Sequence, residues 1–186
     1  MQSNFIKMDK ITVKDKIFKP YISDKELQES ITLIAEKINH DYSGKSPIFI
    51  GVLNGSFMFM SDLLKKINLQ CTVSFVKLAS YEGTATTGKV SELIGLNEDL
   101  EGQDIILVED IVDTGNTLIK LYEILEEKKV NSIKIASLLF KPDAYKKSHP
   151  IDYIGKKIPN AFVLGYGLDY DGWGRNLSSI YVLDEK

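Results

Sequence analysis

VEDIVDTGNT, residues 108–117, stands between two segments of different periodicity. Before it, the run up to Val108 that begins at Asp104 is mostly apolar, as expected of a strand buried on both faces of a sheet. After it, apolar residues from Leu118 to Leu125 recur at helical spacing. Glu109 to Gly115 is therefore predicted to be a polar turn between a strand and a helix. In open α/β sheets, ligands bind at such turns, beside the carboxyl ends of the strands.

Strand and helix patterns alternate on both sides of this turn. Such alternation predicts an α/β fold, with a parallel sheet and helices on its faces. Residues 81–95 contain glycines and threonines without apolar periodicity, so they are predicted to form a mobile loop. The chain beyond Phe140 is rich in Lys, Pro, Tyr and Gly and is expected to form a small lobe beside the sheet. The other expected elements are helices at 23–42, with capping-box spacing at Ser23 and Glu26, and at 57–67, and strands at 47–53, 71–79 and 131–139.

The composition is that of an ordinary globular protein, with 44% hydrophobic and 26% charged residues, and the length fits a single domain over residues 1–186. A formal net charge of −3 argues against a general nucleic-acid-binding surface, so no nucleic-acid partner is expected. The only cysteine, Cys71, excludes an intrachain disulfide. No apolar run approaches the ~20 residues of a membrane span, and residues 1–19 lack a signal-peptide core. A cytoplasmic protein without a membrane partner is expected.

The residue types in 109–117 suit a sugar phosphate. Free N–H groups at the start of a helix bind phosphate, and Gly115 would let the backbone approach it closely. Either Asp113 or Thr114 is expected to cap that helix. The adjacent carboxylates Glu109 and Asp110 would repel phosphate but suit the vicinal hydroxyls of a ribose, directly or through a cation. Together these groups predict a site for a ribose 5-phosphate.

Residues 107–117 resemble the signature of the type I phosphoribosyltransferases: two apolar residues, two acidic, two apolar, then Asp-Thr-Gly-x-Thr. Further stretches are similar to the hypoxanthine-guanine branch of that family and occur in its order: GVLNGS at 51–56, Ser80-Tyr81, Lys141, and FVLGYGLDY at 162–170 leading to Arg175. The resemblance implies a central parallel sheet with flanking helices and a small lobe, from the chain's C-terminal and N-terminal parts, over the site. It also implies transfer of the 5-phosphoribosyl group of phosphoribosyl pyrophosphate to hypoxanthine or guanine, which gives IMP or GMP and pyrophosphate.

The same resemblance implies a role for each candidate residue. Ribose and its 5-phosphate would be bound by Glu109, Asp110, Asp113, Thr114, Gly115, Asn116 and Thr117. Pyrophosphate would be bound by Leu53, Asn54, Gly55, Ser80, Tyr81 and Arg175, and the family often has a cis peptide after the leucine. The purine would be bound by Lys141, Phe162, Val163, Leu168 and Asp169. Asp113 would be the general base at purine N7, and Mg²⁺ would be held by Glu109, Asp110 and Asp169.

Two features depart from the family pattern. Asn54 replaces the basic residue often found in the pyrophosphate loop, so backbone N–H groups would supply more of the contact there. The residues before Arg175 are glycine-rich where a helical spacing is more usual, which leaves the roles of Arg175 and Trp173 open.

Two other functions are compatible with the fold. One is a phosphoribosyltransferase for xanthine or a pyrimidine base, and the other is a non-catalytic nucleotide sensor that binds RNA. The acidic balance and the intact set of Asp113, Lys141 and Asp169 disfavour the non-catalytic sensor. The sequence does not rank hypoxanthine, guanine and xanthine. A homo-oligomer is expected because the family is usually dimeric or tetrameric.

Overall fold

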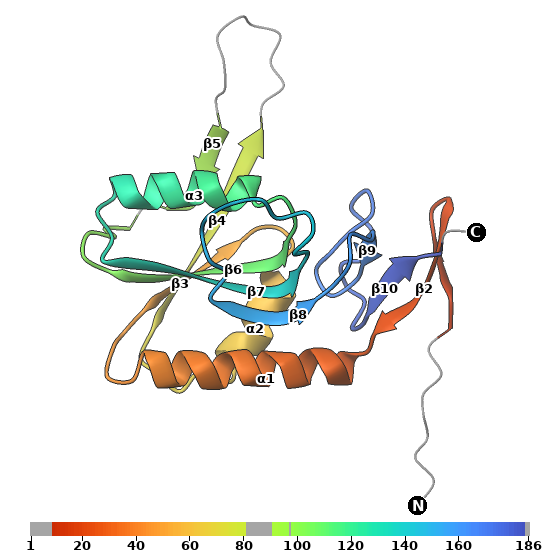
Figure 1. The fold of residues 1–186 in the computed structure, drawn as a ribbon, viewed down its shortest axis with the longest axis horizontal. Coiled ribbons are helices and arrows are strands. Elements are labelled where there is room, and N and C mark those ends of the chain that lie inside the picture. The colour runs from red at the N-terminus through yellow and green to blue at the C-terminus, as the bar shows by residue number, and fades with distance from the viewer. Residues whose placement is uncertain (1–8, 81–90, 97, 185–186) are drawn as a thin grey trace, which may run out of the picture.

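The computed structural model describes residues 9–80, 91–96 and 98–184. Its described strands form two sheets (Figure 1). The larger sheet has six strands in the order β5-β4-β3-β6-β7-β8, and the smaller has four in the order β1-β2-β10-β9. Helices α1 and α2 cover one face of the larger sheet and α3 covers the other (Figure 1). The smaller sheet lies beside the larger one and forms a separate lobe (Figure 1). The predicted α/β fold is therefore confirmed.

The larger sheet contains five parallel strands and one antiparallel edge strand. The parallel strands are β3 (Ile48–Val52), β4 (Thr72–Ser80), β6 (Asp104–Val112), β7 (Ser132–Phe140) and β8 (Tyr153–Lys157). β5 (Ser91–Ile94) pairs with β4 in the antiparallel direction. Because β6 pairs with β3 on one side and β7 on the other, its backbone is held from both directions. The pairing with β3 ends at Val108 and that with β7 continues to Val112, so β7 holds the carboxyl end of β6.

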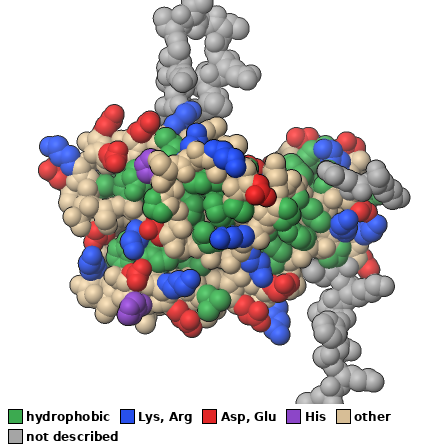
Figure 2. Space-filling model, in the orientation of Figure 1, with side chains coloured by type: hydrophobic (Ala, Val, Ile, Leu, Met, Phe, Trp, Pro, Cys, Tyr) green, Lys and Arg blue, Asp and Glu red, His purple; other side chains and the backbone are tan. Residues whose placement is uncertain are grey.

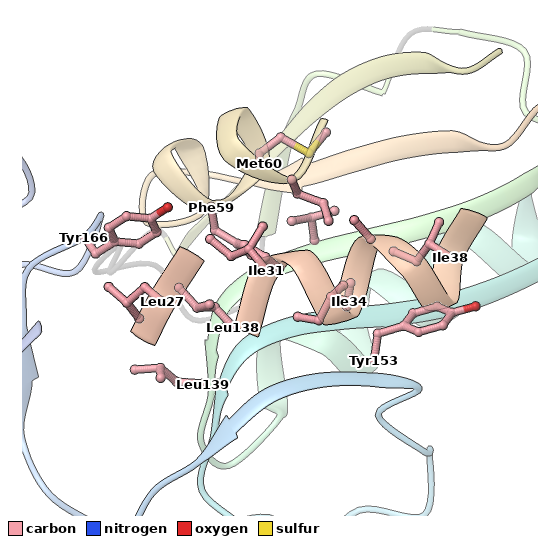
Figure 3. Close-up of a cluster of buried hydrophobic side chains, with 14 of the residues drawn as sticks. Leu27, Ile31, Ile34, Ile38, Phe59, Met60, Leu138, Leu139, Tyr153 and Tyr166 are labelled. Atoms are coloured by element: carbon pink, nitrogen blue, oxygen red, sulfur yellow. The ribbon is translucent and has the colours of Figure 1, made fainter. Parts of the chain in front are cut away.

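Amphipathic helices account for the core on each face of that sheet. α1 (Asp24–Asp41) begins at the N-cap Ser23 and has the capping box with Glu26 that the spacing predicts. Its apolar face packs with α2 (Phe57–Leu64) and the sheet around side chains such as Phe59 and Leu138 (Figure 3). α3 (Asn116–Glu127) covers the second core, on the other face. None of the helices in the described ranges is both long enough and apolar enough to span a bilayer.

The lobe is built from both ends of the described chain. Its strands are β1 (Ile11–Val13), β2 (Lys16–Ile22), β9 (Val163–Leu164) and β10 (Ile180–Leu183), all paired antiparallel. β2 and β10 lie next to each other at its centre. Acidic and basic side chains are interspersed over the face drawn in Figure 2, which covers the larger sheet and the lobe.

Three local predictions are wrong. The turn predicted to begin at Glu109 is still strand, because Ile111 and Val112 continue the ladder with β7. Part of the predicted loop 81–95 is the strand β5, whose backbone pairs along the edge of β4, whereas residues 81–90 lie outside the described residues. The chain beyond Phe140 does not go wholly to the lobe, since β8 extends the larger sheet.

Candidate active site

Two adjacent carboxylates lie at the carboxyl end of β6. Glu109 is buried within the pairing to β7, opposite Ser137, and Asp110 follows it directly. Oδ1 of Asp110 accepts a hydrogen bond of 2.9 Å from the backbone N–H of Ile111. Alternation along the strand sends the two side chains to different faces, so they address a ligand from separate directions.

Burial dominates the titration of this acidic pair. It raises the pKa of Glu109 well above the usual value, and the charge of Asp110 raises it further. Burial also raises the pKa of Asp110 to about 6, against hydrogen bonds from the backbone N–H groups of Ile111 and Asp110 and the charge of Arg175. The charge of Asp169 acts in the raising direction on Asp110. A buried carboxylate pair of this kind is suited to hydroxyl groups or a cation that would offset its desolvation.

Residues 113–117 form the predicted phosphate site at the start of a helix, and we call this segment the cradle. They line a small hollow of about 100 Å³ together with Glu109, Ile111, Val112 and Leu118. The helix α3 begins at Asn116, and its N-cap is Gly115, with a φ of 77° and no side-chain cap. The prediction that Asp113 or Thr114 caps this helix is therefore wrong. The first N–H groups of α3 lack a capping side chain, as a phosphate-binding helix start requires.

Asp113 instead forms an ion pair with Lys141, which directly follows β7. Nζ of Lys141 lies 2.8 Å from Oδ2 of Asp113, and the lysine is 7% exposed. The backbone N–H of Lys141 donates to the carbonyl of Val112 at 2.9 Å, which fixes the start of its segment beside β6. The Asp113 side chain is 44% exposed, so it remains open to a ligand on its other side. A hydrogen-bond donor and an acceptor thus stand next to each other at the rim of the cradle.

The predicted pyrophosphate loop lies against Asp110. The peptide between Leu53 and Asn54 is cis, as the resemblance implies, and Asn54 is exposed. A Cβ on Gly55 would overlap the carboxylate of Asp110, so the loop backbone lies directly on that side chain. From the lobe, Gly167 lies so close that a Cβ there would overlap the carbonyl oxygen of Gly55. Three segments distant in sequence therefore meet at Gly55.

An aromatic group in the lobe contains the predicted stacking residue. Phe162 is 42% exposed, and its ring centroid lies 5.9 Å from that of Tyr170 and 6.1 Å from that of Phe18. Nζ of Lys16 lies 5.7 Å from the centroid of the Phe162 ring and 4.6 Å from that of Tyr170. Val163, next in sequence, is in β9 and buried. An exposed ring supported by neighbouring aromatic rings can present one face to a planar ligand.

Asp169 and Arg175 form an ion pair within the segment that connects β9 and β10. Nη2 of Arg175 lies 2.5 Å from Oδ1 of Asp169, and Nη1 donates to the carbonyl of Gly167 at 2.7 Å. Leu168, between Gly167 and Asp169, is partly buried against the core. The guanidinium predicted to reach pyrophosphate is therefore engaged with Asp169, near Asp110.

These segments coincide with a known family. Residues 22–171 match the family model described as the phosphoribosyl transferase domain. The chain belongs to the phosphoribosyltransferase family. It is 40% identical to the hypoxanthine-guanine phosphoribosyltransferase of Staphylococcus aureus (strain Mu50) over 163 residues, which are 87% of this chain and 91% of that protein.

Solved structures of phosphoribosyltransferases share this fold. The hypoxanthine phosphoribosyltransferase of Staphylococcus aureus superimposes with a TM-score of 0.82 at 40% identity, covering 89% of this chain and 91% of that one. The hypoxanthine phosphoribosyltransferase of Trypanosoma cruzi superimposes with a TM-score of 0.80 at 34% identity, covering 90% and 97%. The predicted type I phosphoribosyltransferase fold is thereby confirmed.

Most of the predicted site residues lie around one edge of the sheet. Ser80 ends β4, and Tyr81 lies outside the described residues, so that pair is not placed. Sequence reasoning missed Lys16, Tyr170 and Tyr145. The ring of Tyr145 packs on Gly115, where a Cβ would overlap it. No spacing in the sequence relates Lys16 or Tyr145 to the site, since each reaches it through tertiary packing. Tyr170 ends the stretch 162–170, but the resemblance assigned it no role.

Proposed function

We propose that this phosphoribosyltransferase transfers the 5-phosphoribosyl group of phosphoribosyl pyrophosphate to hypoxanthine or guanine, and so serves purine salvage. The observation that carries the proposal is the contact of 2.8 Å between Lys141 and Asp113 at the rim of the 113–117 cradle. In this pair, Lys141 would donate to a 6-oxo oxygen and Asp113 would accept from a purine N–H, next to the proposed phosphate site. A 6-oxopurine presents those two groups on one edge.

The cradle and the acidic pair would hold the sugar. N–H groups of 114–117 and the hydroxyls of Thr114 and Thr117 would bind the 5-phosphate, while Glu109 and Asp110 would accept hydrogen bonds from the ribose hydroxyls. With the sugar fixed at both ends, C1 would be held in line between base and pyrophosphate. As pyrophosphate departs and C1 becomes cation-like, the purine nitrogen would attack from the opposite face. Asp113 would take the proton from N7.

The donor set fits Mg²⁺. Across the described ranges, no three His, Cys, Asp or Glu side chains cluster closely enough to hold a metal by themselves. Mg²⁺ is usually held by one or two carboxylates together with substrate phosphates, and the mutually repelling Asp110 and Asp169 would supply such carboxylates. When bound, Mg²⁺ would neutralise charge on the departing pyrophosphate. We expect turnover to be lost in excess EDTA and restored by added Mg²⁺, and full turnover in EDTA would contradict this assignment.

The loop and the lobe would complete the site. Backbone groups of Leu53–Gly55 would bind pyrophosphate, and Asn54 adds no charge there. Ser80 and Tyr81 keep the pyrophosphate role that the family resemblance implies, as does Arg175. Phe162 would stack on the purine, with Val163, Leu168 and Asp169 around its edge. We further propose a single domain over residues 1–186, a homo-oligomer and a cytoplasmic location.

A panel of free bases tests the proposal. With phosphoribosyl pyrophosphate and Mg²⁺, an absorbance assay should give kcat/KM for hypoxanthine and guanine at least about a hundredfold above that for adenine, because the Lys141 ammonium cannot accept from an amino group. Lys141→Ala should lower this ratio, because it removes a hydrogen bond to the 6-oxopurines and so lowers their kcat/KM. Lys37→Ala, an exposed lysine of α1, is the matched control and should leave the ratio unchanged. Turnover of no base would favour a nucleotide-sensing regulator, and a preference for xanthine or a pyrimidine would reassign the substrate.

A further inference from the structure

The turn Gly165–Asp169 has an unusual backbone that needs an anchor. Gly165, Tyr166 and Gly167 have φ values of 103°, 50° and 100° in succession. Positive φ is readily adopted by glycine but unfavourable for a residue with a side chain, so Tyr166 must be held there by its surroundings. The turn is closed by two hydrogen bonds of 3.1 Å between Gly165 and Leu168. Its backbone faces the site, and the tyrosine side chain points away from it, into the core.

The Tyr166 side chain ends in a polar group of two helices. It is 1% exposed and lies beside Leu27 and Phe59 (Figure 3). Its hydroxyl donates to Oδ2 of Asp62 in α2 and accepts from Nε2 of Gln28 in α1 at 3.2 Å. Nε2 of Gln28 also donates to Oδ2 of Asp62, at 2.7 Å. The polar end of the tyrosine is therefore satisfied within an apolar core, as buried hydroxyls require.

Asp62 connects this polar group to the pyrophosphate loop. α2 begins at Phe57, directly after the loop Leu53–Gly55 and the N-cap Ser56. A displacement of α2 would therefore displace Gly55. On the other side of the site, Gly167 lies against the carbonyl of Gly55. One hydrogen-bonded group thus holds both walls that converge on Asp110.

We propose that Tyr166, through Asp62 and Gln28, is a positioning residue for phosphoribosyl pyrophosphate. This inference rests on the proposed function. The tyrosine hydroxyl sets the separation between the Leu53–Gly55 loop and the Gly167–Asp169 turn. That turn carries the Asp169 carboxylate and the Gly167 carbonyl, both of which bind the Arg175 guanidinium. The turn also carries Leu168 and Asp169 at the proposed purine edge. The stacking ring of Phe162, however, packs on Phe18 and Tyr170, and Lys141 is held by Asp113, so hypoxanthine binding depends less on this anchor.

The chain offers a matched control in Tyr153. It is also buried, 2% exposed, and its hydroxyl donates to Oδ2 of Asp41 at 2.8 Å. Figure 3 shows Tyr166 and Tyr153 toward opposite ends of α1. Removing either hydroxyl deletes one partly buried tyrosine–aspartate hydrogen bond, but only Tyr166 adjoins the site. Comparison of the two phenylalanine variants therefore separates positioning from a general loss of stability.

The test measures the two substrates separately. Tyr166→Phe should raise KM for phosphoribosyl pyrophosphate roughly tenfold, because small misplacements of binding groups are costly, and should change KM for hypoxanthine less than about twofold. Tyr153→Phe should lower the melting temperature comparably and leave both KM values unchanged. If Tyr166→Phe behaves like Tyr153→Phe, or raises both KM values equally, Tyr166 has only a structural role.

Variants of Asp62 decide the question if Tyr166→Phe does not fold. Asp62→Asn keeps an acceptor for the tyrosine hydroxyl and should leave KM near that of the wild type. Asp62→Ala removes the acceptor and should reproduce the tenfold effect, and equal KM values in the two Asp62 variants would overturn the proposal. Calorimetric titration with phosphoribosyl pyrophosphate and Mg²⁺ gives the same comparison without turnover. A wild type that binds this ligand but converts no base, with weaker binding in Tyr166→Phe, would overturn the proposed function alone, whereas a wild type that binds none would overturn both.

Discussion

The carboxyl edge of the larger sheet and the small lobe supply the two halves of the candidate site, and they are built differently. At the sheet edge, Glu109 and Asp110 belong to β6, which pairs with β3 up to Val108 and with β7 through Val112. In the lobe, Phe162 is exposed on the surface and is held by side-chain contacts with Tyr170 and Lys16. The sugar-phosphate half is thus positioned by the backbone and the base half by packing. Substitutions at the edge should alter chemistry or stability, and those in the aromatic group of the lobe should alter base affinity.

The largest expected effect is at Asp113, on the sheet edge. Asp113→Asn keeps the size of the side chain but removes the group that accepts the purine proton. We expect kcat to fall by roughly 10²- to 10⁴-fold with a smaller change in KM, measured in single turnovers so that product release does not mask the step. Asp143→Asn, an exposed carboxylate two residues after Lys141, is the control and should leave kcat unchanged. An unchanged single-turnover rate in Asp113→Asn would remove Asp113 from this role.

The buried carboxylate Asp110 should make stability depend on pH in an unusual direction. Because burial raises its pKa from 3.8 to about 6, the folded protein binds a proton that the unfolded chain has released, so this group lowers the free energy of unfolding as pH rises from about 4 to about 6. The full contribution is roughly 3 kcal/mol. Asp110→Asn abolishes it, so its stability relative to the wild type should increase from pH 4 to pH 7. Denaturant titrations at both pH values that give the same difference would contradict the assignment.

The junction between edge and lobe can be tested with two glycines of similar backbone conformation. Gly167 and Gly172 have φ values of 100° and 84°, but a Cβ would overlap the carbonyl of Gly55 only at Gly167, with nothing within 4 Å at Gly172. Gly172→Ala should cost about 1 kcal/mol of stability from backbone strain alone. Gly167→Ala should cost about 2 kcal/mol more and raise KM for phosphoribosyl pyrophosphate. Equal effects of the two variants in thermal unfolding would mean that the lobe moves away from the loop and so relieves the overlap at Gly55.

The smallest expected effect is at Phe162 in the lobe. Phe162→Leu keeps apolar contact but removes the flat ring, so KM for hypoxanthine should rise by roughly three- to tenfold while KM for phosphoribosyl pyrophosphate stays unchanged. Trp173→Leu replaces another exposed aromatic residue of the lobe, 64% exposed, and should leave both KM values unchanged. A larger effect at Trp173 than at Phe162 would indicate that the tryptophan, and not Phe162, stacks on the purine.

The parts of the fold that could be predicted are those encoded within short segments. The capping box at Ser23 and Glu26 and the buried strand before Glu109 each depend on neighbours in sequence, and both are confirmed. The cradle at 113–117 likewise lies in one continuous segment. The end of β6 was mispredicted because two acidic residues usually indicate a turn, whereas here the ladder with β7 continues past them.

The contacts that complete the site could not be predicted, because they join segments distant in the sequence. Asp113 is 28 residues from Lys141, and that ion pair engages the carboxylate expected to cap α3. Gly167 reaches Gly55, and Tyr145 covers Gly115, only through the packing of separate elements. Glycine at these positions was visible in the sequence, but what it approaches depends on the tertiary structure.

The order of synthesis gives the lobe a particular consequence. β2, at residues 16–22, is made before its central partner β10, at residues 180–183, and the rest of both sheets lies between them in the sequence except β1. On a ribosome, the carboxyl edge of the larger sheet, with its phosphate cradle, can assemble before β2 has paired with β10. A nascent chain can therefore present the sugar-phosphate half before it can form the base half. One edge of β2 stays unpaired until β10 has been made, which makes Lys16 and Lys19 useful as charges that discourage pairing with other chains.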